Sequence, residues 1–258
     1  MRDALHTEVH GRAGANRCVL LHGFTQTGRC WTPTTGELAP DHEVVTVDLP
    51  GHGGSGHVRG DLWRTAALAA DAGAGTWVGY SMGARVALHV ALARPDVVER
   101  LVLVSGTAGL RDAGERAARR AADSELAARI ERIGVPAFLD EWLALPMFSR
   151  VAPARSCRSE RLRNHAAGLA ASLRSSGTGT QEPLWERLPE LATTPVLVVS
   201  GAHDERFTAL GAEIAAAVGS SASHVVMAQC GHTPPLEDPP AFGSLLRAWL
   251  AASSPASG

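Results

Sequence analysis

The sequence predicts an α/β fold with a mostly parallel central sheet flanked by helices. Through the first half of the chain, short runs rich in β-branched residues alternate with Gly-rich turns and Ala-rich helical stretches. This alternation is the pattern of successive βαβ units. The length of 258 residues suits one large domain of this class and is ample for a buried core.

Four strands are predicted in the first half of the chain. We expect them at residues 18–21, 43–49, 76–80 and 99–105. The second strand ends in a Gly-rich segment over 50–56 that can only be a loop. The third strand is followed, after Ser81, by a helix over 82–93 that Pro95 closes off.

Between residues 107 and 191 the strand pattern disappears, and helix-forming Ala, Arg, Leu and Glu dominate with breaks at Gly and Pro such as Gly134 and Pro136. Strands return at 195–200 and 224–227, and an amphipathic helix follows at about 240–251. We therefore expect an α/β core formed by residues 1–106 and 192–258, with a helical lid inserted at 107–191.

Composition restricts the classes of partner. The chain is 45% hydrophobic and 19% charged, which is ordinary for a folded domain. No apolar run reaches the roughly 20 residues needed to span a membrane. The net charge of −2 provides no general field for holding nucleic acid or an anionic membrane. We expect neither kind of partner, and a monomer or small homo-oligomer.

The sequence also bears on location and cofactors. Residues 1–10 include two acidic side chains and lack the apolar centre of a secretory signal, which predicts a cytoplasmic location. The four cysteines are scattered without a C-x-x-C pair, which predicts reduced thiols and neither a structural zinc site nor a disulfide framework. No P-loop, dinucleotide-binding glycine pattern or metal-spaced histidine pair occurs, so we expect no cofactor and no metal.

A candidate nucleophile lies in the segment GYSMG at residues 79–83. This G-x-S-x-G stands between a predicted strand and a predicted helix, as a nucleophile elbow requires. The glycines let the strand and the helix pack closely around a strained serine, whose Oγ is then exposed at the carboxyl edge of the sheet. A serine that caps an ordinary helix is the alternative, but the flanking strand and helix favour the elbow and Ser81 as the nucleophile or base.

A serine hydroxyl needs a histidine to take its proton and a carboxylate to orient that histidine. His232 follows the strand at 224–227, and Asp204 follows the strand before it. The order Ser81, Asp204, His232 is that of the α/β-hydrolase fold, which we take as the specific fold prediction. Two other acids are weaker candidates, because Asp48 precedes the serine and Asp238 follows the histidine too closely.

In this fold the oxyanion hole combines the backbone N–H after the nucleophile with one from the loop after an early strand. Those positions are Met82 and Phe24 in this chain. Gly23, directly before Phe24, permits the close backbone approach that such a hole requires.

Arginines are concentrated in the predicted lid. Residues 111–187 contain 13 arginines and 10 acidic residues, a net charge of +3 in a chain whose total is −2, and the chain contains no lysine. Most of these arginines are expected on solvated helix faces beside interleaved acids. Because Arg is the side chain best shaped to bind carboxylates, we expect two or three to point into the cleft.

Together these motifs resemble one family, the 2-succinyl-6-hydroxy-2,4-cyclohexadiene-1-carboxylate (SHCHC) synthases of menaquinone biosynthesis. The similarity covers most of the chain and includes LHGF at 21–24, VDLPGHG at 47–53 and VGYSMGAR at 78–85. The lid is more specific, with Gly109-Leu110, a run of arginines and acids over 115–123, Trp142 and GTGTQ at 177–181.

The resemblance implies a cofactor-free lyase that eliminates pyruvate from an enolpyruvyl cyclohexene carboxylate. The triad would remove a proton from the substrate ring, acting as a base through Ser81 without an acyl-enzyme. The substrate would be a small polycarboxylate. The resemblance also implies its binding residues: carboxylate binders Arg85, Arg116 and Arg163, with Arg119 able to exchange roles with Arg116, and pocket-lining Tyr80 and Trp142.

Departures from the family pattern leave other substrates open. Leu143 stands where an aromatic residue is often found, and Pro235 replaces a frequent histidine. The same triad would serve a relative from secondary metabolism, or a serine hydrolase of an ester, a thioester or a vinylogous carbon–carbon bond. A non-catalytic binding protein would be expected to lack a triad member, and none is missing.

Overall fold

The computed structural model describes residues 4–252, so the ends of the predicted core, 1–3 and 253–258, lie outside the described residues. Seven strands form one sheet in the order β1-β3-β2-β4-β5-β6-β7. All neighbouring strands are parallel except β1, which runs antiparallel to β3. The predicted α/β class is therefore confirmed. The strands are β1 (Thr7–Gly11), β2 (Arg17–Leu21), β3 (Glu43–Val47), β4 (Gly75–Tyr80), β5 (Val98–Val104), β6 (Val196–Gly201) and β7 (Ala222–Met227).

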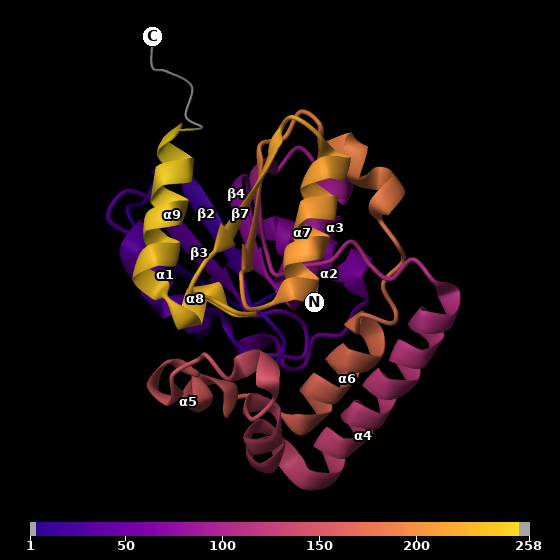
Figure 1. The fold of residues 1–258 in the computed structure, drawn as a ribbon. Coiled ribbons are helices and arrows are strands. Elements are labelled where there is room, and N and C mark those ends of the chain that lie inside the picture. Colours follow the sequence, from indigo (N-terminus) through magenta and orange to yellow (C-terminus); the bar gives the residue numbers. More distant parts are fainter. Residues whose placement is uncertain (1–3, 253–258) are drawn as a thin grey trace.

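Helices cover both faces of this sheet (Figure 1). One face packs against α2 (Leu62–Ala69), α3 (Met82–Ala93) and α7 (Glu205–Val218), and the other against α1 (Thr32–Leu38) and α9 (Pro239–Ala252). Successive residues of a strand supply the two layers, as their alternation requires. In β2, for example, Val19 faces the first layer and Leu20 the second, and both are fully buried.

The edge strand β1 was not predicted from the sequence. It pairs antiparallel with β3 from Thr7 opposite Val47 to Gly11 opposite Glu43. Its residues are alternately exposed and half-buried, and Val9 is 64% exposed. Because so little of β1 enters the core, its hydrophobic pattern is too weak to identify it.

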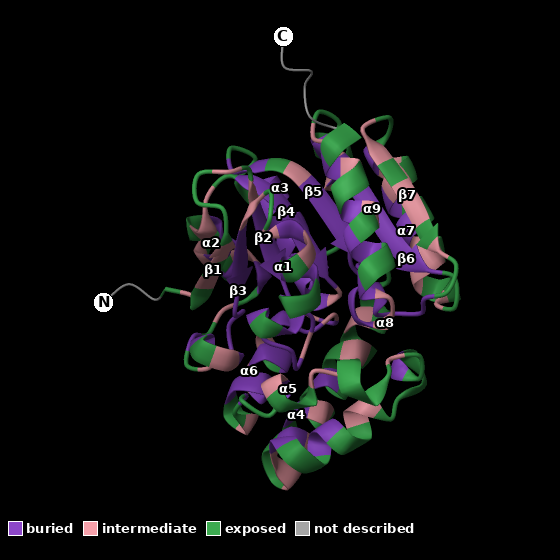
Figure 2. Cartoon of the chain, turned by 90° about the vertical axis from the view of Figure 1, so that its left-hand side faces the viewer, coloured by how far each residue is buried: buried purple, intermediate pink, exposed green. Residues whose placement is uncertain are grey.

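Three helices of the chain between β5 and β6 form a separate layer beyond one end of the sheet (Figure 1). We call α4 (Ala113–Leu143), α5 (Arg158–Arg161) and α6 (Ala166–Ser176) the inserted helices. α4 and α6 pack around a small apolar cluster of their own that includes Ile130, Phe138 and Leu169. The outer surface of this layer is largely exposed (Figure 2). α4 bends at Gly134, whose φ of 76° and ψ of 166° lie outside the helical range, two residues before Pro136.

A short helix, α8 (Pro234–Glu237), and several single turns complete the described chain. The turn η1 (Gly28–Trp31) follows the loop after β2, and η6 (Trp185–Leu191) leads from the inserted helices back into the sheet. Among the helices of residues 4–252, none combines the length and apolar character needed to cross a bilayer.

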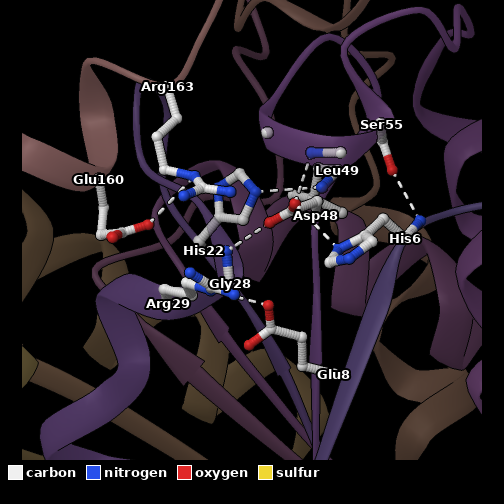
Figure 3. A network of polar contacts seen from close by, with 12 residues as sticks. His6, Glu8, His22, Gly28, Arg29, Asp48, Leu49, Ser55, Glu160 and Arg163 are labelled. Carbon is white, nitrogen blue, oxygen red and sulfur yellow. Dashed lines mark hydrogen bonds and ion pairs between the residues drawn. The ribbon is translucent and has the colours of Figure 1, made fainter.

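Two buried histidines fasten the loops that follow β2 and β3. His22 Nε2 accepts a hydrogen bond from the Leu49 N–H at 3.0 Å (Figure 3), and His52 Nε2 accepts one from the Thr25 N–H at 3.3 Å. Each Nδ1 lies within 3.0 Å of a backbone carbonyl, so both rings are neutral with the proton on Nδ1. Burial lowers the pKa of His22 to about 4 and that of His52 to about 3.

These buried histidines predict a loss of stability in mild acid. The unfolded chain takes up a proton on each histidine near pH 6.5, whereas the folded chain does so only near pH 4 or pH 3. The contribution of these neutral histidines to the free energy of unfolding is therefore fully present above about pH 7. It is lost as the pH falls from about 6.5 toward the pKa of the folded state, by up to ~1.4 kcal/mol per pH unit for each histidine. Urea unfolding between pH 7 and pH 5 measures this slope. It should be shallower in His52→Gln and unchanged in His57→Gln, whose histidine is exposed; equal slopes in all three proteins would contradict the assignment.

Candidate active site

Ser81 occupies a strained turn between β4 and α3. Its φ of 52° lies in the left-handed region that a non-glycine residue rarely adopts. The turn is possible because Gly83 has no side chain: a Cβ there would overlap the Leu21 carbonyl oxygen at the end of β2. The first turn of α3 therefore packs directly on the neighbouring strand, and Ser81 stands at the carboxyl edge of the sheet, as the G-x-S-x-G motif predicts.

The structure brings the three predicted triad residues together. His232 Nε2 lies 3.3 Å from Ser81 Oγ, and His232 Nδ1 lies 2.6 Å from Asp204 Oδ2. The histidine side chain is 1% exposed and Asp204 is 17% exposed. A carboxylate on Nδ1 fixes the tautomer that leaves Nε2 free to take the serine proton. The geometry is that of a general base acting through a serine.

Asp204 and His232 come from loops that a second glycine brings together. Asp204 also caps α7, since its Oδ1 accepts a hydrogen bond from the Phe207 N–H at 3.3 Å. Gly201, at the end of β6, lies so close to the carbonyls of Cys230 and Gly231 that a Cβ would overlap both. The His203 N–H then donates to the Cys230 carbonyl at 3.0 Å, so the two loops are held side by side.

Glu237, which the sequence analysis did not identify, holds the histidine loop from its other side. Its Oε1 accepts a hydrogen bond from the Thr233 N–H at 2.7 Å, and its Oε2 accepts one from the Gly231 N–H. These two N–H groups flank His232. One carboxylate thus fixes the backbone on both sides of the histidine. The rings of Phe207 and Tyr80 pack against the imidazole, with ring centroids 4.6 and 5.7 Å from its centroid.

The backbone N–H groups of Phe24 and Met82 are both available for the predicted oxyanion hole. Within residues 4–252 neither N–H donates a hydrogen bond to the protein, and both residues line the cavity beside Ser81. The loop that carries Phe24 is fixed by the Gly23 N–H, which donates to Gln26 Oε1 at 3.0 Å, and by the contact with His52. Two unused donors on fixed backbone are what an oxyanion hole requires.

A cavity opens beside Ser81 between the sheet and the inserted helices, and it is lined by the predicted Tyr80 and Trp142. The Tyr80 hydroxyl pairs with Thr233 Oγ1 at 2.9 Å, and burial raises the pKa of this tyrosine. Trp142 stacks on Phe138 and meets the edge of Phe24. Its Nε1 is buried and has no hydrogen-bond partner in the described chain.

Two of the predicted arginines, Arg85 and Arg119, line this cavity. Arg85 is 7% exposed and donates to the Ser176 carbonyl at 2.8 Å. Burial lowers its pKa to about 10, so the guanidinium remains charged at neutral pH. Among the described residues it forms no salt bridge, because the nearby Asp123 is paired with Arg119 at 2.8 Å. A buried cation without its own carboxylate favours an anionic ligand.

The structure corrects the expectation for Arg116 and Arg163, neither of which lines the cavity. Arg116 donates to the carbonyls of Leu110 and Arg111 at 2.9 and 2.7 Å, because it lies in the first turn of α4. Arg163 pairs with Glu160 at 3.5 Å and points toward the polar network around Asp48 (Figure 3).

Two arginines that the sequence analysis did not select line the cavity instead. Arg161 is fully buried and donates to the Phe24 carbonyl at 3.3 Å and to Thr25 Oγ1. Arg206 lies at the start of α7, over the ring of Phe207. The concentration of arginine in the lid was the only sequence signal for Arg161, and Arg206 had none. The cavity therefore combines a serine–histidine–aspartate group with four guanidinium groups.

Comparisons with known proteins agree with this geometry. Residues 18–244 match the model of the alpha/beta hydrolase family. A putative SHCHC synthase of Bacillus subtilis (strain 168) is 36% identical, covering 93% of this chain and 92% of the relative. The SHCHC synthase of Escherichia coli O1:K1 / APEC is 33% identical, with 91% and 94% covered. The structure of MenH from S. aureus superposes with a TM-score of 0.88 at 27% identity, covering 96% of this chain and 98% of that chain.

The resemblance inferred from the motifs is thereby confirmed, and so is the α/β-hydrolase fold. Both relatives align over nine tenths of this chain, the inserted helices included, and not over the elbow alone. The chain belongs to the alpha/beta hydrolase family and, within it, to the family of SHCHC synthases.

Proposed function

We propose that this protein is a cofactor-free lyase that eliminates pyruvate from an enolpyruvyl cyclohexene carboxylate. The observation that carries the proposal is the cavity, where a base of the serine–histidine–aspartate type stands beside Arg85, a buried cation that lacks its own carboxylate. A neutral ester would leave that charge unpaired, whereas a polycarboxylate would pair it. The names of the relatives agree with this choice of substrate.

In the proposed reaction, His232 takes the Ser81 hydroxyl proton as Ser81 Oγ removes a proton from the substrate ring. The electron pair of the broken C–H bond forms a ring double bond, and the bond from the ring carbon to the enolpyruvyl oxygen breaks. The leaving group is the pyruvate enolate, which becomes pyruvate on protonation. Asp204 stabilises the imidazolium. The N–H groups of Phe24 and Met82 supply donors for oxygen charge that develops on the substrate.

The proposal assigns the cavity arginines to substrate binding. Arg85 and Arg119, with Arg161 and Arg206, would bind the carboxylates, and Tyr80 and Trp142 would border the ring. Residues 107–191 would act as a lid on a core of 1–106 and 192–258. A cytoplasmic location and a monomer or small homo-oligomer remain predictions from the sequence.

The proposal is tested by incubating the purified protein with the enolpyruvyl precursor of SHCHC and measuring pyruvate. We expect stoichiometric release of pyruvate without added metal or cofactor. A panel of short activated esters and thioesters is the control. Efficient hydrolysis of that panel without pyruvate release would favour the serine hydrolase instead.

Replacing Ser81, Asp204 or His232 with Ala should each lower kcat by on the order of a thousandfold or more. The three losses should not add, because the residues act as one unit. Circular dichroism and thermal unfolding check that each variant folds. An Asp204→Ala variant with nearly full activity would show that another carboxylate orients His232.

The arginine assignment predicts a substrate-dependent loss. Arg119→Ala removes a charged donor at the cavity, and each carboxylate–arginine pair is typically worth a few kcal/mol. We expect kcat/KM on the polycarboxylate to fall by roughly tenfold to a thousandfold. Arg85→Ala should lower kcat/KM in the same way. It should also lower the free energy of unfolding, because removing this buried side chain leaves a cavity.

Two variants control this experiment. Arg116→Ala, one turn earlier on α4, and Arg129→Ala, whose side chain pairs with Glu141 on the exposed face, should both retain activity. The cleavage of a neutral ester, if measurable, should be unchanged in Arg119→Ala. Equal losses on neutral and anionic substrates would mean that Arg119 supports the fold.

Glu237 should act on kcat through the position of His232. In Glu237→Gln the amide can accept only one of the two N–H groups that flank the histidine, and in Glu237→Ala neither is paired. We expect kcat to fall more in the alanine variant than in the glutamine variant, with KM nearly unchanged because Glu237 does not line the cavity. A rise in KM at constant kcat would instead assign Glu237 to substrate binding.

A further inference from the structure

Two of the four cysteines meet across the boundary between the core and the inserted helices. Cys30 lies in η1, directly after the loop that carries Phe24, and Cys157 is the residue before α5. Cys157 Sγ lies 3.9 Å from the Cys30 carbonyl oxygen, so the side chain of Cys157 reaches the backbone of Cys30, and each thiol shifts the pKa of the other. Both are free thiols, separated by 127 residues in the chain.

The surroundings of the two thiols differ. Cys30 is 3% exposed, whereas Cys157 is only partly buried. The hydrogen bond from Cys30 and the charge of Arg161 hold the pKa of Cys157 below its ordinary value. Burial raises the pKa of Cys18 to about 12 and that of Cys230 to about 11. Cys157 is thus the thiol that ionises most readily and reaches solvent, with a second thiol beside it.

We propose that Cys30 and Cys157 form a reversible disulfide that ties the inserted helices to the core when the protein meets a peroxide. The pair has the arrangement of a redox-responsive site: an accessible sulfur that reacts first and a buried partner that resolves it. The proposal does not depend on the lyase activity, because it rests on contacts outside the triad.

The reaction balances with hydrogen peroxide as the oxidant. The Cys157 thiolate attacks one peroxide oxygen, the O–O bond breaks and hydroxide leaves, so the sulfur becomes a sulfenic acid. The Cys30 sulfur then attacks the Cys157 sulfur, the S–O bond breaks, and the hydroxyl leaves as water with the Cys30 proton. The two thiols lose two electrons and two protons in total, and the peroxide is reduced to two molecules of water.

The disulfide would act at the wall of the cavity. Cys157 is followed by the single turn of α5, which ends at Arg161, and Arg161 contacts the Phe24 carbonyl and Thr25 Oγ1. Cys30 follows the same loop on the core side. A covalent bond at this point would prevent α5 from moving away from the loop that bears the oxyanion donor.

The test is oxidation of the full-length protein by a small excess of hydrogen peroxide, followed by blocking of free thiols and peptide mass mapping. We expect one cross-linked peptide pair joining Cys30 to Cys157, a loss of two hydrogens in mass, and free Cys18 and Cys230. Because the bond closes a long loop, the melting temperature of the oxidised protein should rise by roughly 5 °C or more and return on treatment with dithiothreitol.

Two variants make the result specific. Cys157→Ser, a change at a partly exposed position, should show no rise in melting temperature, and Cys230→Ala should behave as the parent protein. Oxidation that stops at a sulfinic acid on Cys157 with Cys30 still free would overturn the proposal. The proposal would also be overturned by an oxidised protein that contains the disulfide but melts no higher than the reduced protein. The bond would then not tie the inserted helices to the core.

Discussion

The site depends on the contact between the first turn of α3 and the end of β2. Gly83 lies against the Leu21 carbonyl, and any side chain at that position would push the helix away from the sheet. The backbone at Ser81 absorbs the resulting sharp turn through its positive φ. This close packing places the serine between the loop of Phe24 on one side and the loop of His232 on the other.

The remaining catalytic geometry is built around that turn from rigid parts. Asp204 is both a helix cap and the partner of His232, so the same carboxylate begins α7 and orients the imidazole. Glu237 fixes the backbone on both sides of the histidine, and His52 holds the Phe24 loop by accepting a hydrogen bond from the Thr25 N–H. His52, Asp204 and His232 lie in the segments that follow the parallel strands β3, β6 and β7, and Glu237 lies in α8 directly after the last of these segments. The carboxyl edge of the sheet thus brings together loops from distant parts of the sequence.

Electrostatics then separate this site from that of a general esterase. Burying Arg85 without a carboxylate costs stability unless a ligand supplies the charge, because a desolvated cation needs a partner. The charge of Asp123 opposes the effect of burial on the pKa of Arg85, but its carboxylate is bound to Arg119 and to the Gly179 N–H and forms no ion pair with Arg85. A cavity with fixed positive charge beside the serine–histidine–aspartate group is suited to a substrate that carries its own negative charges.

How far the sequence predicted this arrangement differs from residue to residue. The triad was predictable because each member follows a strand that shows in the sequence as a short run rich in β-branched residues. The order serine, aspartate, histidine along the chain then indicates the α/β-hydrolase fold. The exposed edge strand β1 has no such pattern. Whether an arginine of the inserted helices lines the cavity depends on which face of its helix packs inward. Tertiary contacts determine that face, and the sequence pattern does not show them.

Arg161 is the last residue of α5 and lines the cavity, whereas Arg163 lies beyond the end of that helix, in a turn where it pairs with Glu160. The sequence pattern does not show where so short a helix ends, so it could not distinguish these two arginines. Glu237 was missed because its role is to bind backbone N–H groups, which leave no mark on the pattern of side chains.

The central claim is that Ser81 acts as a base and never becomes acylated. The most direct measurement is the intact mass of the enzyme, quenched during turnover of the enolpyruvyl substrate, with pyruvate measured in the same samples. The account predicts pyruvate equal to the substrate consumed and a protein mass that stays that of the free enzyme at every time point. A covalent adduct on Ser81 that forms and decays with turnover would contradict it.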